Sequence, residues 1–241
     1  MASVGWPLCL LRSSMNSLAK AGLLCCLLCG SLAHAAGINI GTTRVIFHGD
    51  AKDASISISN SDNVPYLIQS WAQSISETGA SGDAPFMVTP PLFRLNGGQK
   101  NVLRIIRTGG NLPEDRESLY WLDIKSIPSS NPDNKHNTLM LAVKAEFKLI
   151  YRPKALTQKP EEVADRLTWS RQGRTLTVKN PTPYYMNFAT LSVGSQKVKA
   201  PRYVAPFGNA QYTLPAAASG PIVWSIINDF GGTGPEHKQT P

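Results

Sequence analysis

The chain has 241 residues and a formal net charge of +8 at pH 7, a length that suits one large or two ordinary domains. Its Lys and Arg residues are spread along the sequence and gather on no predicted helix, which argues against nucleic-acid binding. A basic surface of this kind favours an acidic protein partner or the cell envelope. No long apolar run follows residue 32, so the rest of the chain is not expected to span a membrane.

The N-terminal segment has the pattern of a secretory signal. Lys20 supplies a positive charge, residues 21–32 form an apolar run too short for a membrane span, and A-H-A at 33–35 offers a small-x-small cleavage site. We expect residues 1–36 to be removed on export, with the mature start at residue 36 or 37 and Met15 as an alternative to Met1. Removing Arg12 and Lys20 leaves a net charge of 8 − 2, roughly +6.

All four cysteines lie in that segment, at positions 9, 25, 26 and 29. They are interpreted as apolar filler, because none follows the Leu-small-small run that a lipoprotein anchor needs. The exported chain therefore carries no disulfide, no thiol nucleophile and no thiolate metal site. About 200 residues must then hold together through their hydrophobic core alone.

Strand patterns fill the next 90 residues. Candidate strands lie at 38–47, 54–60, 64–72, 86–95, 101–107 and 117–127, separated by polar loops at 73–84, 112–116 and 129–136. Trp71 is of a residue type that packs between two sheets. Pro90-Pro91 interrupts the fourth candidate and indicates an edge strand or a crossover between sheets.

Residues 137–153 stand out, because apolar side chains fall on every second position from 139 to 151. This is the period of a β-strand, and the strand would be much longer than the usual five or six residues. Pro153 ends it. Periodicity alone favours a buried row, both for Phe147 and its C-terminal neighbours and for the earlier residues of the row.

The second half is predicted to form a smaller sandwich. Short strand candidates lie at 166–170, 175–180, 185–193, 197–203, 210–214 and 222–229, with a helical turn at 161–165 and a frayed polar tail at 231–241. Turn signals recur about every ten residues along the whole exported chain, which is typical of antiparallel immunoglobulin-type sandwiches. We therefore expect two domains, at 37–152 and 153–241.

Seven short motifs now identify a resemblance. In order they are TRVI at 43–46, VPYLIQSW at 64–71, TPPLFRL at 89–95, DRESL at 115–119, FKLIYRP at 147–153, NPTPYY at 180–185 and INDFGG at 227–232. Together they make the exported chain similar to the periplasmic pilus chaperones of the chaperone–usher pathway, a family that lends a strand to its client. The resemblance implies an all-β fold with two immunoglobulin-like β-sandwich domains at an angle and a cleft between them.

The resemblance also implies a function. The protein would bind and stabilise pilus or fimbrial subunits in the periplasm by donor-strand complementation and deliver them to an outer-membrane usher. The short loop at 129–136 is similar to that of the short-loop branch. Three sets of residues match family sites: a donor strand (Leu139, Leu141, Val143), an anchor for the subunit's terminal carboxylate (Arg44, Lys148) and a charged cluster between domains (Glu117, Arg152, Asp229).

No motif in the sequence predicts catalysis. His48, His136 and His237 show no metal-ligand spacing, and neither a G-x-S-x-G elbow nor a phosphate-binding Gly loop occurs. We expect no enzymatic activity, no cofactor and no metal. The alternative is a secreted adhesive or structural β-sandwich protein. Self-association of the free protein through its apolar strand stays open.

Overall fold

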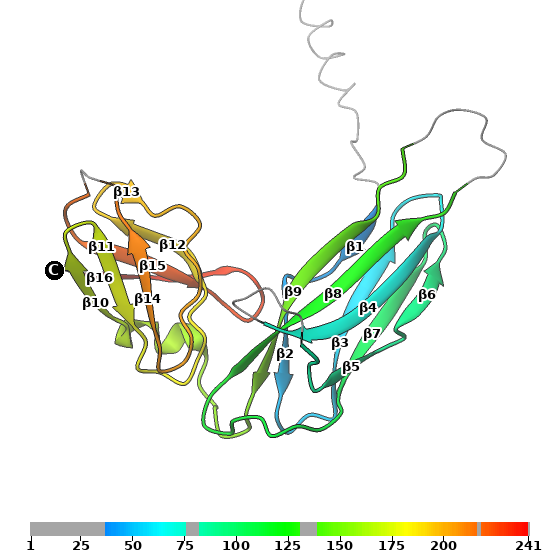
Figure 1. The fold of residues 1–241 in the computed structure, drawn as a ribbon, viewed down its shortest axis with the longest axis horizontal. Helices are drawn as coiled ribbons and strands as arrows, with labels where there is room; N and C mark the ends of the chain where they lie inside the picture. Colours follow the sequence, from blue (N-terminus) through cyan, green and yellow to red (C-terminus); the bar gives the residue numbers. More distant parts are fainter. Residues whose placement is uncertain (1–36, 76–81, 131–138, 216–217, 241) are drawn as a thin grey trace, which may run out of the picture. The chain divides into compact units, whose positions relative to one another are not determined.

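The computed structural model describes residues 37–75, 82–130, 139–215 and 218–240. The predicted signal segment and most of the loop at 129–136 lie outside these residues. The described chain is almost entirely β-structure and folds into two sandwiches in sequence order (Figure 1). The predicted all-β fold with two immunoglobulin-like domains is confirmed.

The first sandwich contains two sheets. One has the strand order β1 (Ile38–Ile40), β3 (Asp53–Asn60), β7 (Lys100–Arg107) and β5 (Phe86–Thr89); the other has the order β2 (Arg44–His48), β9 (Val143–Arg152), β8 (Ser118–Pro128), β4 (Tyr66–Ser74) and β6 (Leu92–Leu95). Apolar side chains from the facing sides of both sheets form one core, which includes Ile58, Leu103, Leu122 and Leu149. Along these strands buried and exposed positions alternate, as the packing of two sheets face to face requires.

Two strand predictions in the first sandwich have different outcomes. The predicted crossover at Pro90-Pro91 is confirmed, because β5 and β6 on either side of it belong to different sheets. The single strand predicted at 38–47 is wrong, since it divides into β1, which pairs with β3, and β2, which pairs with β9. A strand that changes sheets keeps its apolar alternation, so periodicity alone does not reveal the break.

Trp71 does not pack between the sheets, contrary to the prediction. Along β4, Ile68 and Ala72 face the core, and the alternation of a strand places Trp71 on the opposite face. There its ring lies 6.0 Å from the ammonium group of Lys144.

The second sandwich is built around a cluster of aromatic rings. Its sheets have the orders β10 (Thr168–Gln172), β11 (Thr175–Lys179), β14 (Asn209–Thr213), and β13 (Gln196–Lys197), β12 (Phe188–Val193), β15 (Ile222–Ile227), β16 (Thr233–Gln239). Trp169 contacts both Phe188 and Trp224 in the core, at ring-centroid distances of 5.7 and 5.2 Å. The predicted helical turn at 161–165 is confirmed as two short 3-10 helices, η1 (Pro160–Glu162) and η2 (Ala164–Arg166).

Two predictions in this half are wrong. The candidate at 197–203 contributes only its first residue to a strand. The supposed frayed tail forms β16, which pairs with β15 along its length, and the ring of His237 stacks on Trp224 at 5.7 Å. An edge strand is held by main-chain pairing and can expose most of its side chains, so a polar composition does not exclude it.

Candidate functional site

β9 has one complete edge and one incomplete edge. On one side it pairs with β8 from Val143 to Tyr151. On the other side β2 pairs with it in parallel, but only from Lys148 to Arg152. In the described part of the chain, no strand covers this second edge between Val143 and Phe147 (Figure 1). Such an edge offers unpaired main-chain N–H and C=O groups to another chain.

The apolar row beside this open edge is exposed. Leu139, Leu141 and Val143 leave 83%, 66% and 59% of their surface accessible. The burial that periodicity alone favoured for these three residues is therefore wrong, whereas Leu149 and Tyr151 are buried as predicted. Regular strand begins only at Val143, later than predicted, because the ladder with β8 starts there and residues 139–142 pair with no described strand.

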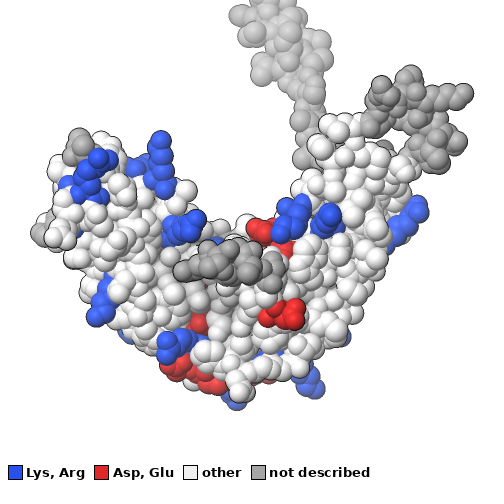
Figure 2. Space-filling view, viewed as in Figure 1, with Lys and Arg blue, Asp and Glu red and all other residues white. Residues whose placement is uncertain are grey.

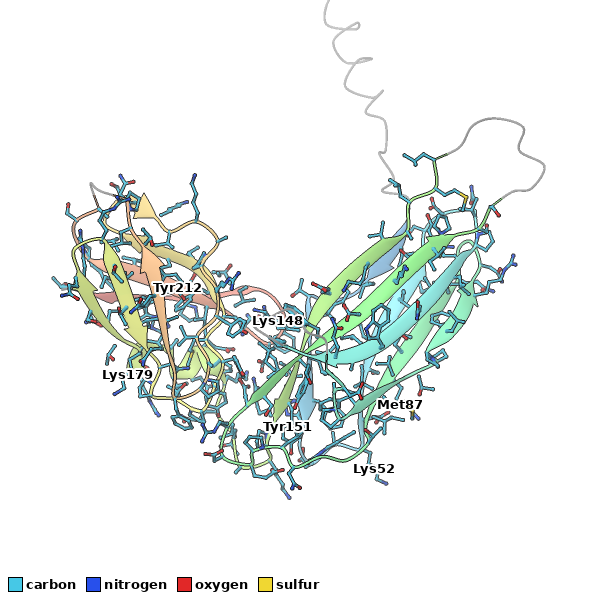
Figure 3. All side chains as sticks on the ribbon, in the orientation of Figure 1. Lys52, Met87, Lys148, Tyr151, Lys179 and Tyr212 are labelled. Carbon is cyan, nitrogen blue, oxygen red and sulfur yellow. The ribbon has the colours of Figure 1, made fainter. Side chains whose placement is uncertain are left out.

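Arg44 and Lys148 lie side by side. They are register partners across the parallel β2–β9 pair, on the sheet face opposite the core. Arg44 is only 6% exposed, and its Nη1 donates to the main-chain oxygen of Ile227 at 3.3 Å. Its Nε is buried and has no hydrogen-bond partner among the described residues. Lys148 is labelled in Figure 3. Its Nζ donates to Asn187 Oδ1.

This pair of cations is electrostatically costly in the free protein. Burial, together with the charge of Arg44, lowers the pKa of Lys148 to about 8. Burial also lowers the pKa of Arg44, although the carboxylates of Asp229 and Glu117 partly offset it. An anion with two oxygens placed here would receive charge-assisted hydrogen bonds and relieve the repulsion between the two cations.

The predicted charged cluster is assembled. Arg152 is 4% exposed, and its Nε donates to Glu117 Oε1 at 2.7 Å. Its Nη1 and Nη2 donate to the two carboxylate oxygens of Asp229 at 2.6 and 2.8 Å. Glu117 Oε2 accepts a further bond from the main-chain N–H of Tyr185 at 2.7 Å. The cluster therefore joins residues of the first sandwich to residues of the second.

Burial shifts the pKa values of Glu117 and Arg152 in opposite directions. It raises the pKa of Glu117, an effect that Arg152 partly counteracts. Burial alone would lower the pKa of Arg152, but the hydrogen bonds and charges of Asp229 and Glu117 outweigh it and hold that pKa above its ordinary value. Glu117 and Arg152 therefore each stabilise the charged form of the other.

Sequence reasoning missed a second ionic cluster beside the open edge. The side chain of Asp123 on β8 is fully buried, and its Oδ1 lies 3.3 Å from Lys144 Nζ, which also contacts Glu146 Oε1 at 2.6 Å. Burial raises the pKa of Asp123, and Lys144 lowers it in part. The available signal was that Asp123 is the one acidic residue in the apolar stretch LYWLDI at 119–124 of its strand candidate.

Asn187 and Tyr203 were also missed. Asn187 accepts from Lys148, and the ring of Tyr203 lies 5.0 Å from the Lys148 ammonium group. Both belong to the second sandwich, so no local pattern around Lys148 could have pointed to them.

Among the described residues, no helix is both long and apolar enough to cross a membrane, and no group of three or more His, Cys, Asp or Glu side chains could hold a metal ion.

Two sandwiches with an open strand edge beside a pair of cations define a protein that can bind an extended polypeptide. Two family models match in succession. "Pili and flagellar-assembly chaperone, PapD N-terminal domain" matches residues 37–157, and "Pili assembly chaperone PapD, C-terminal domain" matches residues 162–238. The chain belongs to this family of pilus-assembly chaperones.

Individual relatives agree with the family. Chaperone protein MyfB of Yersinia enterocolitica is 41% identical over 221 residues, which is 82% of each chain. Chaperone protein FimC of Escherichia coli K12 is 40% identical over 204 residues, which is 83% of each chain. Among solved structures, a chain of the Salmonella enterica complex of SafA pilin with the SafB chaperone is 40% identical, with a TM-score of 0.79 over 87% of this chain and 98% of that chain.

Proposed function

We propose that this protein is a periplasmic chaperone that binds pilus or fimbrial subunits by strand donation from β9 and passes them to an outer-membrane usher. The observation that carries the proposal is the open edge at Val143–Phe147, with its exposed apolar row. The similarity to chaperones such as FimC and to the SafA–SafB complex supports the same partner class.

Strand donation explains why an apolar row is left exposed. A subunit that lacks a strand would pair its main chain with the free edge of β9 and cover Leu139, Leu141 and Val143. Fully burying three aliphatic side chains contributes at most roughly 4–9 kcal/mol, before the entropy of ordering both partners is subtracted.

The pair Arg44 and Lys148 would anchor the terminal carboxylate of the subunit. The buried, unpartnered Nε of Arg44 is a donor that lacks an acceptor in the free protein, and a carboxylate supplies one. The anchor also fixes register, because a slip by one residue would turn each apolar side chain of the client to the other face.

The cluster of Glu117, Arg152 and Asp229 would hold the two sandwiches in one arrangement. We place the junction of the domains 37–152 and 153–241 at Pro153, directly after Arg152. A buried ion triad of this kind contributes little net stability but is strongly directional. We further infer that residues 1–36 direct export to the periplasm and that the protein acts by binding energy alone, with neither catalysis nor a cofactor.

Co-expression with a pilus subunit tests strand donation directly. Leu141→Glu places a charge in the donated row and is expected to abolish recovery of the subunit, at an unchanged melting temperature, because Leu141 is exposed in the free protein. Val102→Glu is the matched control, since Val102 is 52% exposed on β7. Normal recovery of the subunit with Leu141→Glu would show that β9 is not the donor.

A further inference from the structure

The second sandwich has an open edge of its own. Its three-stranded sheet has the order β10-β11-β14, so β14 has a neighbour only on the β11 side. In constant-type immunoglobulin domains the corresponding sheet has four strands, with one more beyond this position. Here the chain after β12 forms β13 in the opposite sheet instead, and no strand of the described chain takes the place beside β14.

The direction of the main-chain groups on β14 follows from its ladder. Leu214 N–H donates to Arg174 O at 2.8 Å, and Asn180 N–H donates to Gly208 O at 2.9 Å. Main-chain groups alternate in direction along a strand, so the even-numbered residues face β11. Asn209, Gln211 and Thr213 therefore turn their N–H and C=O groups to the open side, and all three are exposed.

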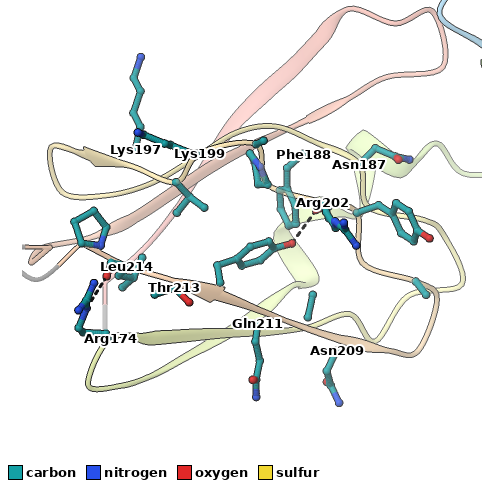
Figure 4. A pocket seen from close by; sticks show the side chains of 18 of the residues that line it. Arg174, Asn187, Phe188, Lys197, Lys199, Arg202, Asn209, Gln211, Thr213 and Leu214 are labelled. Carbon is teal, nitrogen blue, oxygen red and sulfur yellow. Dashed lines mark hydrogen bonds between the residues drawn. The ribbon is translucent and has the colours of Figure 1, made fainter. Parts of the chain in front are cut away.

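A groove runs beside this edge (Figure 4). It has a volume of about 1370 Å³, and residues 197–203 form much of its opposite wall. Aromatic and aliphatic side chains such as Phe188, Tyr212 and Leu214 contribute to its lining. The hydroxyl of Tyr212 donates to Arg202 O at 2.8 Å and ties the two walls together. The groove thus combines apolar and polar side chains with a main-chain edge along one side.

The rim of the groove is basic. Arg174, Lys197, Lys199 and Arg202 line it and are exposed, and its lining contains no carboxylate. In Figure 2, Lys and Arg side chains gather over the part of this sandwich where β13 lies, with no acidic side chain among them. An acidic partner would be attracted to this surface from a distance and would be held in register at short range.

We propose that β14 is a second docking edge, which takes up an extended acidic segment of a partner protein by strand addition. The segment would pair with the outward main-chain groups of Asn209, Gln211 and Thr213. Its alternate apolar side chains would enter the groove, and its carboxylates would meet the basic rim. A strand edge selects a polypeptide, because only a peptide main chain repeats donors and acceptors at the spacing of a strand. The lining of the groove reaches Lys148 of the first sandwich, but the edge that would pair with the segment is β14, so the proposal does not depend on strand donation from β9.

An NMR titration of the isotope-labelled exported chain tests the proposal. The probe is a capped ten-residue peptide of alternating valine and glutamate. It is expected to shift the amide signals of Asn209, Gln211 and Thr213 and to slow their hydrogen exchange at least tenfold. The affinity should fall at least fivefold between about 50 and 300 mM NaCl, because the rim charges are screened. The same peptide with lysine in place of glutamate should not bind.

Two kinds of variant separate the edge from the rim. Gln211→Pro removes an outward N–H and leaves the ladder with β11 intact, so it should abolish binding, whereas Gln211→Ala should retain it. The double variant Lys197→Glu/Lys199→Glu leaves the main chain unchanged and should weaken binding at least tenfold. Leu141→Glu should bind the peptide as the unchanged protein does.

Four results would each overturn the proposal. These are an absence of shifts at β14, shifts confined to β9, equal binding by the folded Gln211→Pro variant, and equal binding of the lysine peptide. Because Leu141→Glu disables only the β9 edge, failure of the β14 site and failure of strand donation from β9 are distinguishable.

Discussion

Lys148 makes client binding dependent on pH in a way that can be calculated. Its pKa in the free protein is about 8, so the side chain is about 90% protonated at pH 7 and about 10% protonated at pH 9. A bound carboxylate stabilises the charged form and raises the pKa of Lys148 in the complex. If the bound form stays protonated, the dissociation constant rises about tenfold from pH 7 to pH 9, equivalent to about 1.4 kcal/mol.

Two neighbouring groups, Arg44 and Tyr185, keep their charge state in this interval. The guanidinium of Arg44 remains charged, and burial raises the pKa of Tyr185 to about 12. The carboxylate of a client is ionised throughout. The change in affinity should therefore follow a single proton, lost as the pH rises through 8.

The assay uses calorimetry with a peptide that has the carboxy-terminal sequence of the client subunit. The free-acid peptide should weaken tenfold between pH 7 and pH 9, whereas its amidated form should bind weakly at both values. Lys148→Arg keeps the charge at pH 9 and should show a flat profile. Equal affinity of the free-acid peptide at pH 7 and pH 9, or an equal pH response of Lys148→Arg, would refute the anchor.

Two further predictions concern the contacts between the sandwiches. Arg152→Ala leaves Glu117 buried without its counter-charge and should destabilise the protein by about 3–5 kcal/mol in denaturant unfolding; adding Glu117→Gln should recover part of this loss, and an unchanged stability would contradict the cluster. Gly231 has φ +87°, and a Cβ there would collide with the Thr43 side chain. Gly231→Ala should therefore lower the melting temperature more than Gly98→Ala, which has φ +69° but open space around it; equal effects would show that the close approach is unimportant.

Local patterns in the sequence predicted most strands but not which strands pair with one another in a sheet. The alternation through residues 139–151 was read correctly as strand from Val143 onward. The same alternation in 38–47 concealed the division between β1 and β2, because both halves are amphipathic. Periodicity reports which side chains share a face and says nothing about which strand lies alongside. For that reason the exposure of Leu139 could not be obtained from the pattern alone.

The candidate site was predictable only through the family motifs. Arg44 and Lys148 are 104 positions apart, and their contact depends on a parallel register that no local rule supplies. The cluster around Arg152 joins residues from three separate motifs in the same way. Asp123 belongs to no motif and escaped notice. Its burial depends on Lys144 of the neighbouring strand, which is a tertiary property.

The geometry of β9 also limits the length and direction of a client strand. β2 occupies the edge of β9 from Lys148 onward and runs parallel to it. A client whose terminal carboxylate lies at Lys148 must end there, and its preceding residues lie along β9 towards Leu139. The last strand of the client therefore runs parallel to β9 and occupies the part of the edge that precedes β2. The edge available to the client, from Lys148 back to Leu139, spans nine residue steps, or roughly 30 Å at about 3.3 Å per residue. The client therefore needs an extended carboxy-terminal segment of about nine or ten residues.

This limit is asymmetric, and peptides of different length test it. Adding two residues after the client's terminus should weaken binding at least tenfold, because the added residues meet β2 and carry the carboxylate away from Arg44 and Lys148. Removing two residues from the opposite end should weaken binding less, since it uncovers only Leu139, which precedes the regular strand. An equal loss at both ends would mean that the terminus of the client is not fixed where β2 begins.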